Sequence, residues 1–429
     1  MTPVTTPLRW MLGFSDPVQG VGWNPRASRA ARWRLGRMRA LLGACGAPQD
    51  EMRVVLIAGT KGKGSTAAFL AAMLHAAGVR AGLFTSPHLQ TFRERIRVDG
   101  AMLTNREFDA AIVRLRPVVA RVRGAHPDAG EPTTFELTLA LALRTFADRG
   151  CTVAVVEVGL GGRLDATNAL DPAVSVLTSV SHDHTAILGR SLGTIATEKA
   201  GVFRKGRPAL LAPQRPIAIR AIRRACRASG AACQVIPPLG VHADLALGGP
   251  HQRLNAALAS AAARALGLGE RPIARGLRTA IWPARFERIR GRPTVILDGA
   301  HNGASAEALA RALRAERSGR RLVLVIGINR DKDARAVLRP LGRVASAIVV
   351  TRSTSPRASD PADVARAAAR ACRAPVTIAA DVLAALAVAR AEAGREGLVC
   401  VAGSLALAGE ARTALGRAPR ERWWTALAD

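Results

Sequence analysis

The run RVVLIAGTKGKGSTAAFLAAMLHAAG at residues 53–78 constrains the fold more than any other part of this sequence. It begins with a β-branched apolar segment typical of a strand, passes through a turn of glycine and lysine, and ends in a segment of helical composition. Gly59, Gly62 and Gly64 let the backbone approach an anion, and the first N–H groups of the helix point toward it. Lys63 adds a full positive charge. The run therefore predicts a strand, a phosphate-binding loop and a helix.

Two positions in this run depart from the common P-loop pattern. Ile57 stands where the long form of the pattern has a glycine, and Gly64 stands where Ser or Thr normally holds Mg²⁺. The hydroxyl is absent or displaced to Ser65, so Mg²⁺ would need a ligand from elsewhere in the chain. A tight strand-to-helix turn without a ligand is the alternative interpretation. The two lysines, Lys61 and Lys63, favour the phosphate site.

Length and hydropathy predict a cytoplasmic protein of several domains. A chain of 429 residues with 49% hydrophobic side chains is long enough for two or three domains with their own cores. No apolar run approaches the roughly 20 residues of a membrane span, and the first residues lack the pattern of a secretory signal. The six cysteines lie far apart without a CxxC pair, so we expect small core residues in a reducing compartment.

The net charge of +30 makes nucleic-acid binding an alternative that must be weighed. Only five of the 62 basic residues are lysine, and the arginines are scattered through helical stretches. Aromatic residues make up 3% of the chain and tyrosine is absent, so platforms for stacking bases are few. We expect no specific nucleic-acid binding, although the charge will attract polyanions. The rarity of lysine draws attention to Lys61, Lys63 and Lys199, where a point charge or an amine could be needed.

Polar residues follow three of the expected strands and form a candidate metal site. Ser86 follows a short strand at residues 81–85, and Glu157 lies inside an almost wholly apolar strand at residues 153–158. A buried carboxylate is costly unless it is paired or bound to metal. His184 follows a third strand. Parallel strands would bring these side chains to one sheet edge. The alternatives are a helix cap for Ser86 and an ordinary polar loop for the HDH run around His184.

The pattern changes at a short polar linker, expected at residues 288–292, and predicts a second domain. We expect an ATP-binding domain at residues 1–287, built on a P-loop-type parallel sheet, and a smaller Rossmann-like α/β domain at residues 288–429. Polar loops such as DGAHN, residues 298–302, again follow strand ends, so an ATP cleft between the two domains is expected. Before the boundary, Gln252 and Asn255 begin an alanine-rich helix, where their amides could cap the helix or contact a ligand.

Eight ordered motifs resemble the folylpolyglutamate synthase and dihydrofolate synthase family of the Mur ligase superfamily. They are GTKGKGS, FTSPHLQTFRERI, FELTLALAL, VEVGLGGRLDATN, DHTAILG followed by EKAG, HQRLNAALA, WPARFE and LDGAHN. The resemblance implies a monomeric, ATP-dependent ligase that adds L-glutamate to dihydropteroate, to reduced folates, or to both. The carboxylate would first become an acyl phosphate, which the glutamate amine then attacks, so catalysis would rest on positioning and charge neutralisation.

The resemblance also assigns roles to individual residues. It implies ATP binding by Lys61, Gly62, Lys63, Gly64 and Ser65 of the loop and by Asn255, Arg285 and Asp298. It implies that Ser86, Glu157 and His184 hold two Mg²⁺ ions, and that Lys199 is carbamylated. Lys63, Lys199 and His301 would be the catalytic residues. Thr133, Leu164, Asp165 and Ala166 match the pteroate-binding positions.

Some positions depart from the family pattern. The N-terminal segment GVGWNPRASRAARWRLGRMRALL matches poorly the stretch with which many members cover the pterin, Ala284 replaces a usual glycine, and His182 replaces an apolar residue. Two other functions remain as alternatives. One is another Mur-type amide ligase that acts on a different carboxylate. The other is a basic ATP-driven nucleic-acid-binding module.

Overall fold

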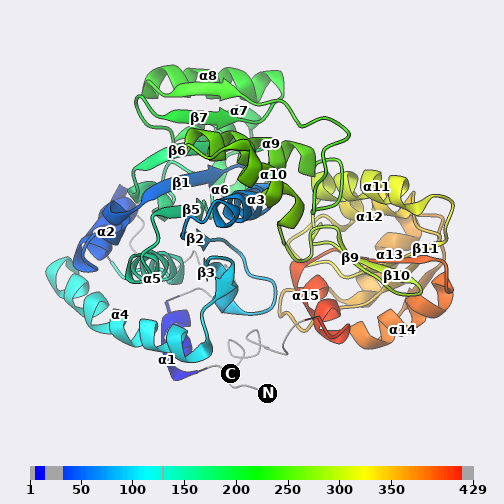
Figure 1. The fold of residues 1–429 in the computed structure, drawn as a ribbon. Coiled ribbons are helices and arrows are strands. Elements are labelled where there is room, and N and C mark those ends of the chain that lie inside the picture. Colours follow the sequence, from blue (N-terminus) through cyan, green and yellow to red (C-terminus); the bar gives the residue numbers. More distant parts are fainter. Residues whose placement is uncertain (1–4, 15–31, 128–129, 418–429) are drawn as a thin grey trace.

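The computed structural model describes residues 5–14, 32–127 and 130–417, which form two α/β units side by side (Figure 1). The first unit carries an eight-stranded sheet and the second a six-stranded sheet. The expected fold class, a parallel-sheet ATPase domain followed by a smaller Rossmann-like domain, is confirmed. Among the described residues, no helix combines the length and the apolar character needed to cross a membrane.

The first sheet places the phosphate-binding run at its centre. Its strands are β1 (Arg53–Ala58), β2 (Ala81–Phe84), β3 (Ile96–Val98), β4 (Ala101–Met102), β5 (Val153–Glu157), β6 (Pro172–Leu177), β7 (Pro208–Leu211) and β8 (Ala232–Val235), in the order β4-β3-β2-β5-β1-β6-β7-β8. β3 pairs antiparallel with both β2 and β4, and the remaining pairs are parallel. Because β1 lies between β5 and β6, polar residues that follow these strands gather around the loop that follows β1.

Helices cover both faces of this sheet. They are α1 (Thr6–Leu12), α2 (Arg32–Ala44), α3 (Lys63–Ala76), α4 (Asn105–Ala125), α5 (Thr134–Asp148), α6 (Thr185–Leu188), α7 (Leu192–Ala200), α8 (Pro216–Ser229), α9 (Gln252–Ala265) and α10 (Glu270–Thr279), with short 3₁₀ turns η1 (Pro48–Glu51), η2 (Phe92–Arg95) and η4 (Ala166–Ala169). Alternate residues of β1 face two separate cores: Val54 and Leu56 pack with α2, α4, α5, α7 and α8, whereas Val55 and Ile57 pack with α3, α9 and α10. Burial on both faces explains the continuous apolar run.

The second unit repeats this design with shorter elements. Its strands are β9 (Glu287–Ile289), β10 (Thr294–Leu297), β11 (Leu322–Ile326), β12 (Ala347–Val350), β13 (Val376–Ile378) and β14 (Leu398–Ala402), in the order β13-β12-β11-β14-β10-β9. Its helices are α11 (Gly303–Arg317), α12 (Ala334–Gly342), α13 (Pro361–Ala371), α14 (Val382–Ala393) and α15 (Leu405–Ala414). Two apolar clusters again lie on opposite faces of the sheet.

The expected linker at residues 288–292 is partly wrong, because its first residues belong to a strand. β9 pairs antiparallel with β10 at the edge of the second sheet. Glu287 forms an ion pair with Arg412 of α15, and Arg288 forms one with Glu316 of α11. An edge strand whose side chains carry charge lacks the apolar run by which the central strands were predicted.

The cysteine prediction is also wrong for one pair. A disulfide joins Cys226 of α8 to Cys233 of β8, with the two Cα atoms 6.2 Å apart. The chain reverses at Gly230, whose φ of +66° is the left-handed conformation that ends many helices, and the reversal brings the two thiols together. Cys151 and Cys400 are buried, as expected for core residues.

Replacing Gly276 of α10 with alanine should lower the thermal unfolding temperature. The added methyl group would lie 2.5 Å from the backbone nitrogen of Met73 in α3, so the two helices would have to separate. Overpacking of this kind typically costs about 1–3 kcal/mol. Gly124 of α4 is the matched control, because no atom lies within 4 Å of its added methyl group and alanine there should stabilise the helix. Calorimetry of both variants checks the prediction, and equal unfolding temperatures would contradict it.

Candidate active site

The phosphate-binding loop runs from the end of β1 to the start of α3. Gly59 adopts φ +139° and Gly62 adopts φ +91°, conformations that other residues rarely reach. A side chain at either position would also meet a neighbour, since a Cβ atom would lie 1.8 Å from Thr178 Oγ1 at Gly59 and 2.2 Å from Asn255 Oδ1 at Gly62. The backbone is therefore held in an open turn at the N-terminus of α3, which suits an anion.

Two predicted catalytic lysines meet at this loop. Lys63 Nζ donates to the Gly59 carbonyl at 3.3 Å, and Lys199 Nζ, from α7, donates to the same oxygen at 3.1 Å. Burial and, after it, the charge of Lys63 lower the pKa of Lys199 to about 7. Lys199 is thus a buried amine with an unusually large neutral fraction at neutral pH.

Ser86 and Glu157 come together at the adjacent ends of β2 and β5. The Ser86 backbone N–H donates to Glu157 Oε2 at 3.1 Å, and Glu157 Oε1 lies 3.8 Å from Lys63 Nζ. Burial raises the pKa of Glu157, while Lys63 opposes the rise. A buried carboxylate beside a serine is a suitable donor set for a hard divalent cation.

His184 lies in the turn after β6, next to Asp183. The His184 side chain is about half exposed. Its partial burial lowers the pKa of the imidazole, and the charges of Lys332 and Lys199 also lower it. Its neighbour Asp183 accepts a hydrogen bond from Lys61 Nζ at 3.0 Å, so the turn that carries His184 lies beside the phosphate loop. Among the described residues, no three His, Cys, Asp or Glu side chains are grouped as metal ligands. A metal site here therefore depends on the hydroxyl of Ser86.

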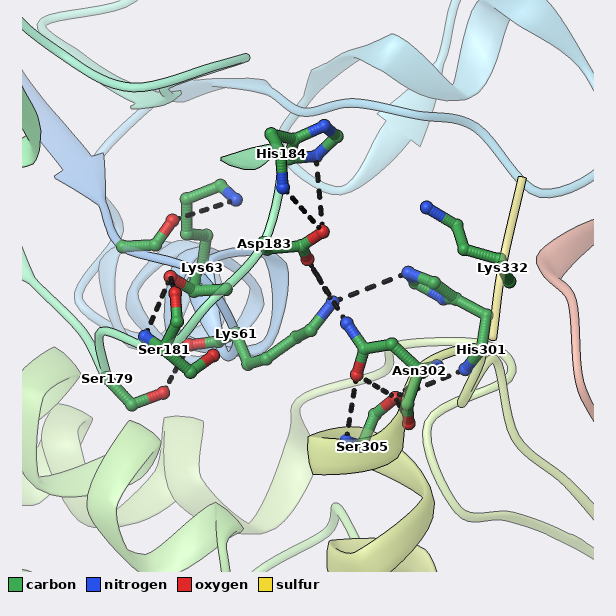
Figure 2. Close-up of polar contacts among 12 residues, drawn as sticks. Lys61, Lys63, Ser179, Ser181, Asp183, His184, His301, Asn302, Ser305 and Lys332 are labelled. Atoms are coloured by element: carbon green, nitrogen blue, oxygen red, sulfur yellow. Dashed lines mark hydrogen bonds and ion pairs between the residues drawn. The ribbon is translucent and has the colours of Figure 1, made fainter. Parts of the chain in front are cut away.

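The second unit places a histidine beside the phosphate loop, as Figure 2 shows. His301 lies in the loop between β10 and α11, and its Nε2 is 3.4 Å from Lys61 Nζ of the phosphate loop. Its Nδ1 is 2.8 Å from the Gly299 carbonyl, a contact that requires the proton on Nδ1 and leaves a lone pair on Nε2. Burial and Lys61 lower the pKa of His301 to about 4, so the ring is neutral at neutral pH.

Of the remaining predicted ATP residues, Asn255 lies against the loop, and Asp298 and Arg285 lie near Gly299 of the second unit. Asn255 of α9 covers Gly62 and donates to Gln252 Oε1 at 2.8 Å. Asp298 ends β10 and accepts hydrogen bonds from the backbone of Phe286 and Ala300, both at 2.8 Å. Burial raises the pKa of Asp298, and the charge of Arg285 opposes the rise.

Trp282 explains why Gly64 replaces the usual hydroxyl residue. A Cβ atom at Gly64 would lie 3.0 Å from the indole ring of Trp282, which belongs to the segment between α10 and β9. The next residue, Ser65, is buried, and its Oγ lies 3.4 Å from Gln252 Nε2. Sequence reasoning did not assign Trp282 to the loop, because no local pattern links residues 64 and 282.

The predicted pteroate positions lie in two well-ordered turns. Thr133 begins α5, where its hydroxyl accepts the Glu136 backbone N–H at 3.1 Å. Asp165 accepts hydrogen bonds from the backbone of Leu160 at 2.9 Å and Thr167 at 3.0 Å. Leu164 and Ala166 flank it, with Ala166 in η4. These hydrogen bonds account for the shape of the two turns. Residues 15–31, which hold much of the divergent N-terminal segment, lie outside the described residues.

Comparisons with known proteins agree with this geometry. The model of the Mur ligase middle domain matches residues 57–212, and that of the Mur ligase, glutamate ligase domain matches residues 284–405. The dihydrofolate synthase/folylpolyglutamate synthase of Bacillus subtilis is 36% identical over 355 residues, which cover 76% of this chain and 82% of the relative.

Two solved structures share the whole architecture. The Mycobacterium tuberculosis folylpolyglutamate synthase complexed with ADP and AMPPCP superposes with a TM-score of 0.84 at 34% identity, covering 90% of this chain and 96% of the other. A Yersinia pestis bifunctional folylpolyglutamate synthase/dihydrofolate synthase with Mn, AMPPNP and L-glutamate bound superposes with a TM-score of 0.78 at 29% identity. This match covers 89% of this chain and 94% of the other. With its two matched domains and its lysine-lined loop, the chain belongs to the dihydrofolate synthase/folylpolyglutamate synthase family.

Proposed function

We propose that this enzyme uses ATP to join L-glutamate to dihydropteroate, to reduced folates, or to both, with the residues named above as its active site. The observation that carries this proposal is the convergence of Lys63, Lys199 and Glu157 at the loop after β1, with His301 of the second unit facing Lys61. Such a cleft can hold a triphosphate on one side and an amino acid on the other. We also propose the division into domains at residues 1–287 and 288–429.

Each group around the cleft has a role that its geometry suits. The loop from Lys61 to Ser65 would bind the phosphates, with Asn255, Arg285 and Asp298 on the rest of the nucleotide. Thr133 and the segment Leu164–Ala166 would contact the pteroate part of the acceptor. Ser86, Glu157 and His184 would hold two Mg²⁺ ions, which would neutralise the phosphoryl oxygens. Hydroxyl, carboxylate and imidazole donors fit such ions, and Glu157 Oε1 already faces a cation.

The reaction needs no nucleophile from the protein. The acceptor carboxylate attacks the terminal phosphorus of ATP and becomes an acyl phosphate, and ADP leaves. The amine of L-glutamate then attacks the acyl carbon, and phosphate leaves through a tetrahedral intermediate. Lys63 stabilises negative charge as it develops on the phosphoryl oxygens. The lone pair on His301 Nε2 can accept a hydrogen bond from the nitrogen of the incoming glutamate and orient it, since the ring is neutral.

Offering each acceptor separately tests the function. Purified enzyme with ATP, Mg²⁺ and labelled L-glutamate should incorporate label into dihydropteroate, tetrahydrofolate, or both, with one phosphate released per glutamate added. If ATP is hydrolysed only with a different carboxylic acid, the enzyme is another Mur-type amide ligase. If no acid supports ATP consumption, the assignment to this reaction class is wrong. The predicted monomer, the cytoplasmic location and the lack of specific nucleic-acid binding stay predictions from the sequence.

Carbamylation of Lys199 belongs to this proposal. A carbamate forms when a neutral amine reacts with CO₂, and a pKa of about 7 leaves roughly half of the Lys199 amines neutral at neutral pH. An ordinary lysine would be neutral in on the order of one molecule in a thousand or fewer. The product is an anion that suits a place beside a divalent cation.

Replacing Lys199 with alanine should abolish ligation, with partial rescue by short carboxylic acids. In the wild-type enzyme, carbamate formation should fall as the pH drops from 8 to 6, because the amine becomes protonated below its pKa of about 7. A ¹³C NMR signal from added ¹³C-bicarbonate, present in the wild type and absent in the variant, measures the modification directly. Full activity in the untreated Lys199→Ala variant would remove the carbamate from the mechanism.

A further inference from the structure

We propose that Asp183 is a positioning residue that joins the phosphate loop, the His184 turn and the second unit across the cleft. Its Oδ2 accepts hydrogen bonds from Lys61 Nζ at 3.0 Å and from Asn302 Nδ2 at 3.1 Å, as Figure 2 shows. Its Oδ1 accepts the backbone N–H of His184 at 3.1 Å. One carboxylate thus contacts three segments that carry proposed site residues. This inference rests on the proposed function for the roles of those residues.

The segment before Asp183 is fixed to the phosphate loop by its own hydrogen bonds. The Thr60 backbone N–H donates to the Ser179 carbonyl at 2.8 Å, and the Ser181 N–H donates to Thr60 Oγ1 at 3.1 Å. Ser179 Oγ donates to the Lys61 carbonyl at 3.2 Å. Residues 179–181 and 60–61 therefore behave as one piece. Asp183, two residues later, stands at a defined distance from the loop.

On the second unit, the contact is equally well defined. Asn302 is the N-cap of α11, where its Oδ1 accepts the Ser305 backbone N–H at 3.0 Å. Because the amide oxygen is committed to the helix, the amide nitrogen faces Asp183. His301 precedes Asn302, so the Asp183–Asn302 bond also fixes the loop that carries the imidazole. This bond therefore contributes to the position of His301 Nε2 beside Lys61.

The charges around Asp183 explain why a carboxylate is needed here. Its side chain is only 14% exposed and lies among Lys61, His184 and Lys332. A neutral side chain would leave the ammonium groups of Lys61 and Lys332 without this negative charge beside them. The Lys61 ammonium would then be free to swing away from the cleft, and the second unit would lose a link to the first. If the proposed function holds the acyl phosphate at the loop after β1 and the amine near His301, a small misplacement of one unit would slow their reaction.

Exchanging the side chains of Asp183 and Asn302 tests the proposal. Asp183→Asn should lower kcat for glutamate addition about tenfold to a hundredfold, with the KM for the acceptor changed by less than about threefold. Asn302→Asp should also lower kcat, because two carboxylates would face each other, while aspartate still caps α11. The double variant Asp183→Asn/Asn302→Asp restores one carboxylate and one amide across the cleft, and its kcat should exceed that of either single variant.

Asp381→Asn is the matched control. Asp381 caps α14 through the Ala384 backbone N–H at 2.8 Å and belongs to no part of the proposed site, so its loss should leave kcat unchanged. If Asp183→Asn matches this control in kcat, or if the double variant is no better than both single variants, the proposal is wrong. Thermal unfolding of all four variants identifies any that fail to fold. If Asp183→Asn fails to fold, Asp183→Ser replaces it, and the same loss of kcat is expected.

Small-angle X-ray scattering gives a readout that does not depend on catalysis. In the ligand-free enzyme, Asp183→Asn should increase the radius of gyration because the two units lose a contact, whereas Asp381→Asn should not. Equal scattering from these two variants would overturn the proposed link. A wild-type enzyme that adds no glutamate to any acceptor would instead contradict the proposed function, and the scattering result would still decide the role of Asp183.

Discussion

The site depends on a single backbone oxygen, the carbonyl of Gly59, which accepts hydrogen bonds from both Lys63 and Lys199. The amino groups of Lys63 and Lys199 repel each other when both are charged, and the Glu157 carboxylate lies 3.8 Å from Lys63 Nζ. The two lysines therefore concentrate positive charge at the loop after β1. A triphosphate would relieve that repulsion, and the same field keeps Lys199 partly neutral and therefore reactive toward CO₂.

The loop that provides this carbonyl is shaped by distant parts of the chain. Thr178 lies against Gly59, Asn255 lies against Gly62, and Trp282 lies against Gly64. These neighbours come from the end of β6, from α9 and from the segment that leads into the second unit. Each glycine is required because another element occupies the space of its side chain. The shape of the phosphate site is therefore a tertiary property, and substitutions far along the sequence would disturb it.

The central strands were predictable from the sequence, and the short strands β3, β4 and β9 were not. Strands β5, β10 and β11 are buried on both faces, so their apolar runs were sufficient to identify them. The short strands β3, β4 and β9 have mixed composition and lie at or near sheet edges, where pairing rather than hydropathy defines them. The disulfide was missed for a similar reason, since a spacing of seven residues does not reveal that a helix reverses into a strand.

The candidate site divides in the same way. Ser86, Glu157 and His184 could be proposed because each follows or ends a predicted strand, and parallel strands share an edge. The contact of Asp183 with Asn302 could not, because it joins residues 119 positions apart in two different units. Relative placement of the units is set by many side chains together, and no periodic pattern in the sequence encodes it.

The indole ring of Trp282 has an optical consequence. It lies against Gly64 at the start of α3, where the phosphates of a nucleotide would arrive, and its surroundings would change in polarity when they do. Tyrosine is absent from the chain, and tryptophan occurs six times, so ultraviolet emission comes almost entirely from a few indoles. The protein thus carries a built-in fluorophore whose spectrum can report occupancy of the cleft in real time, without any attached dye.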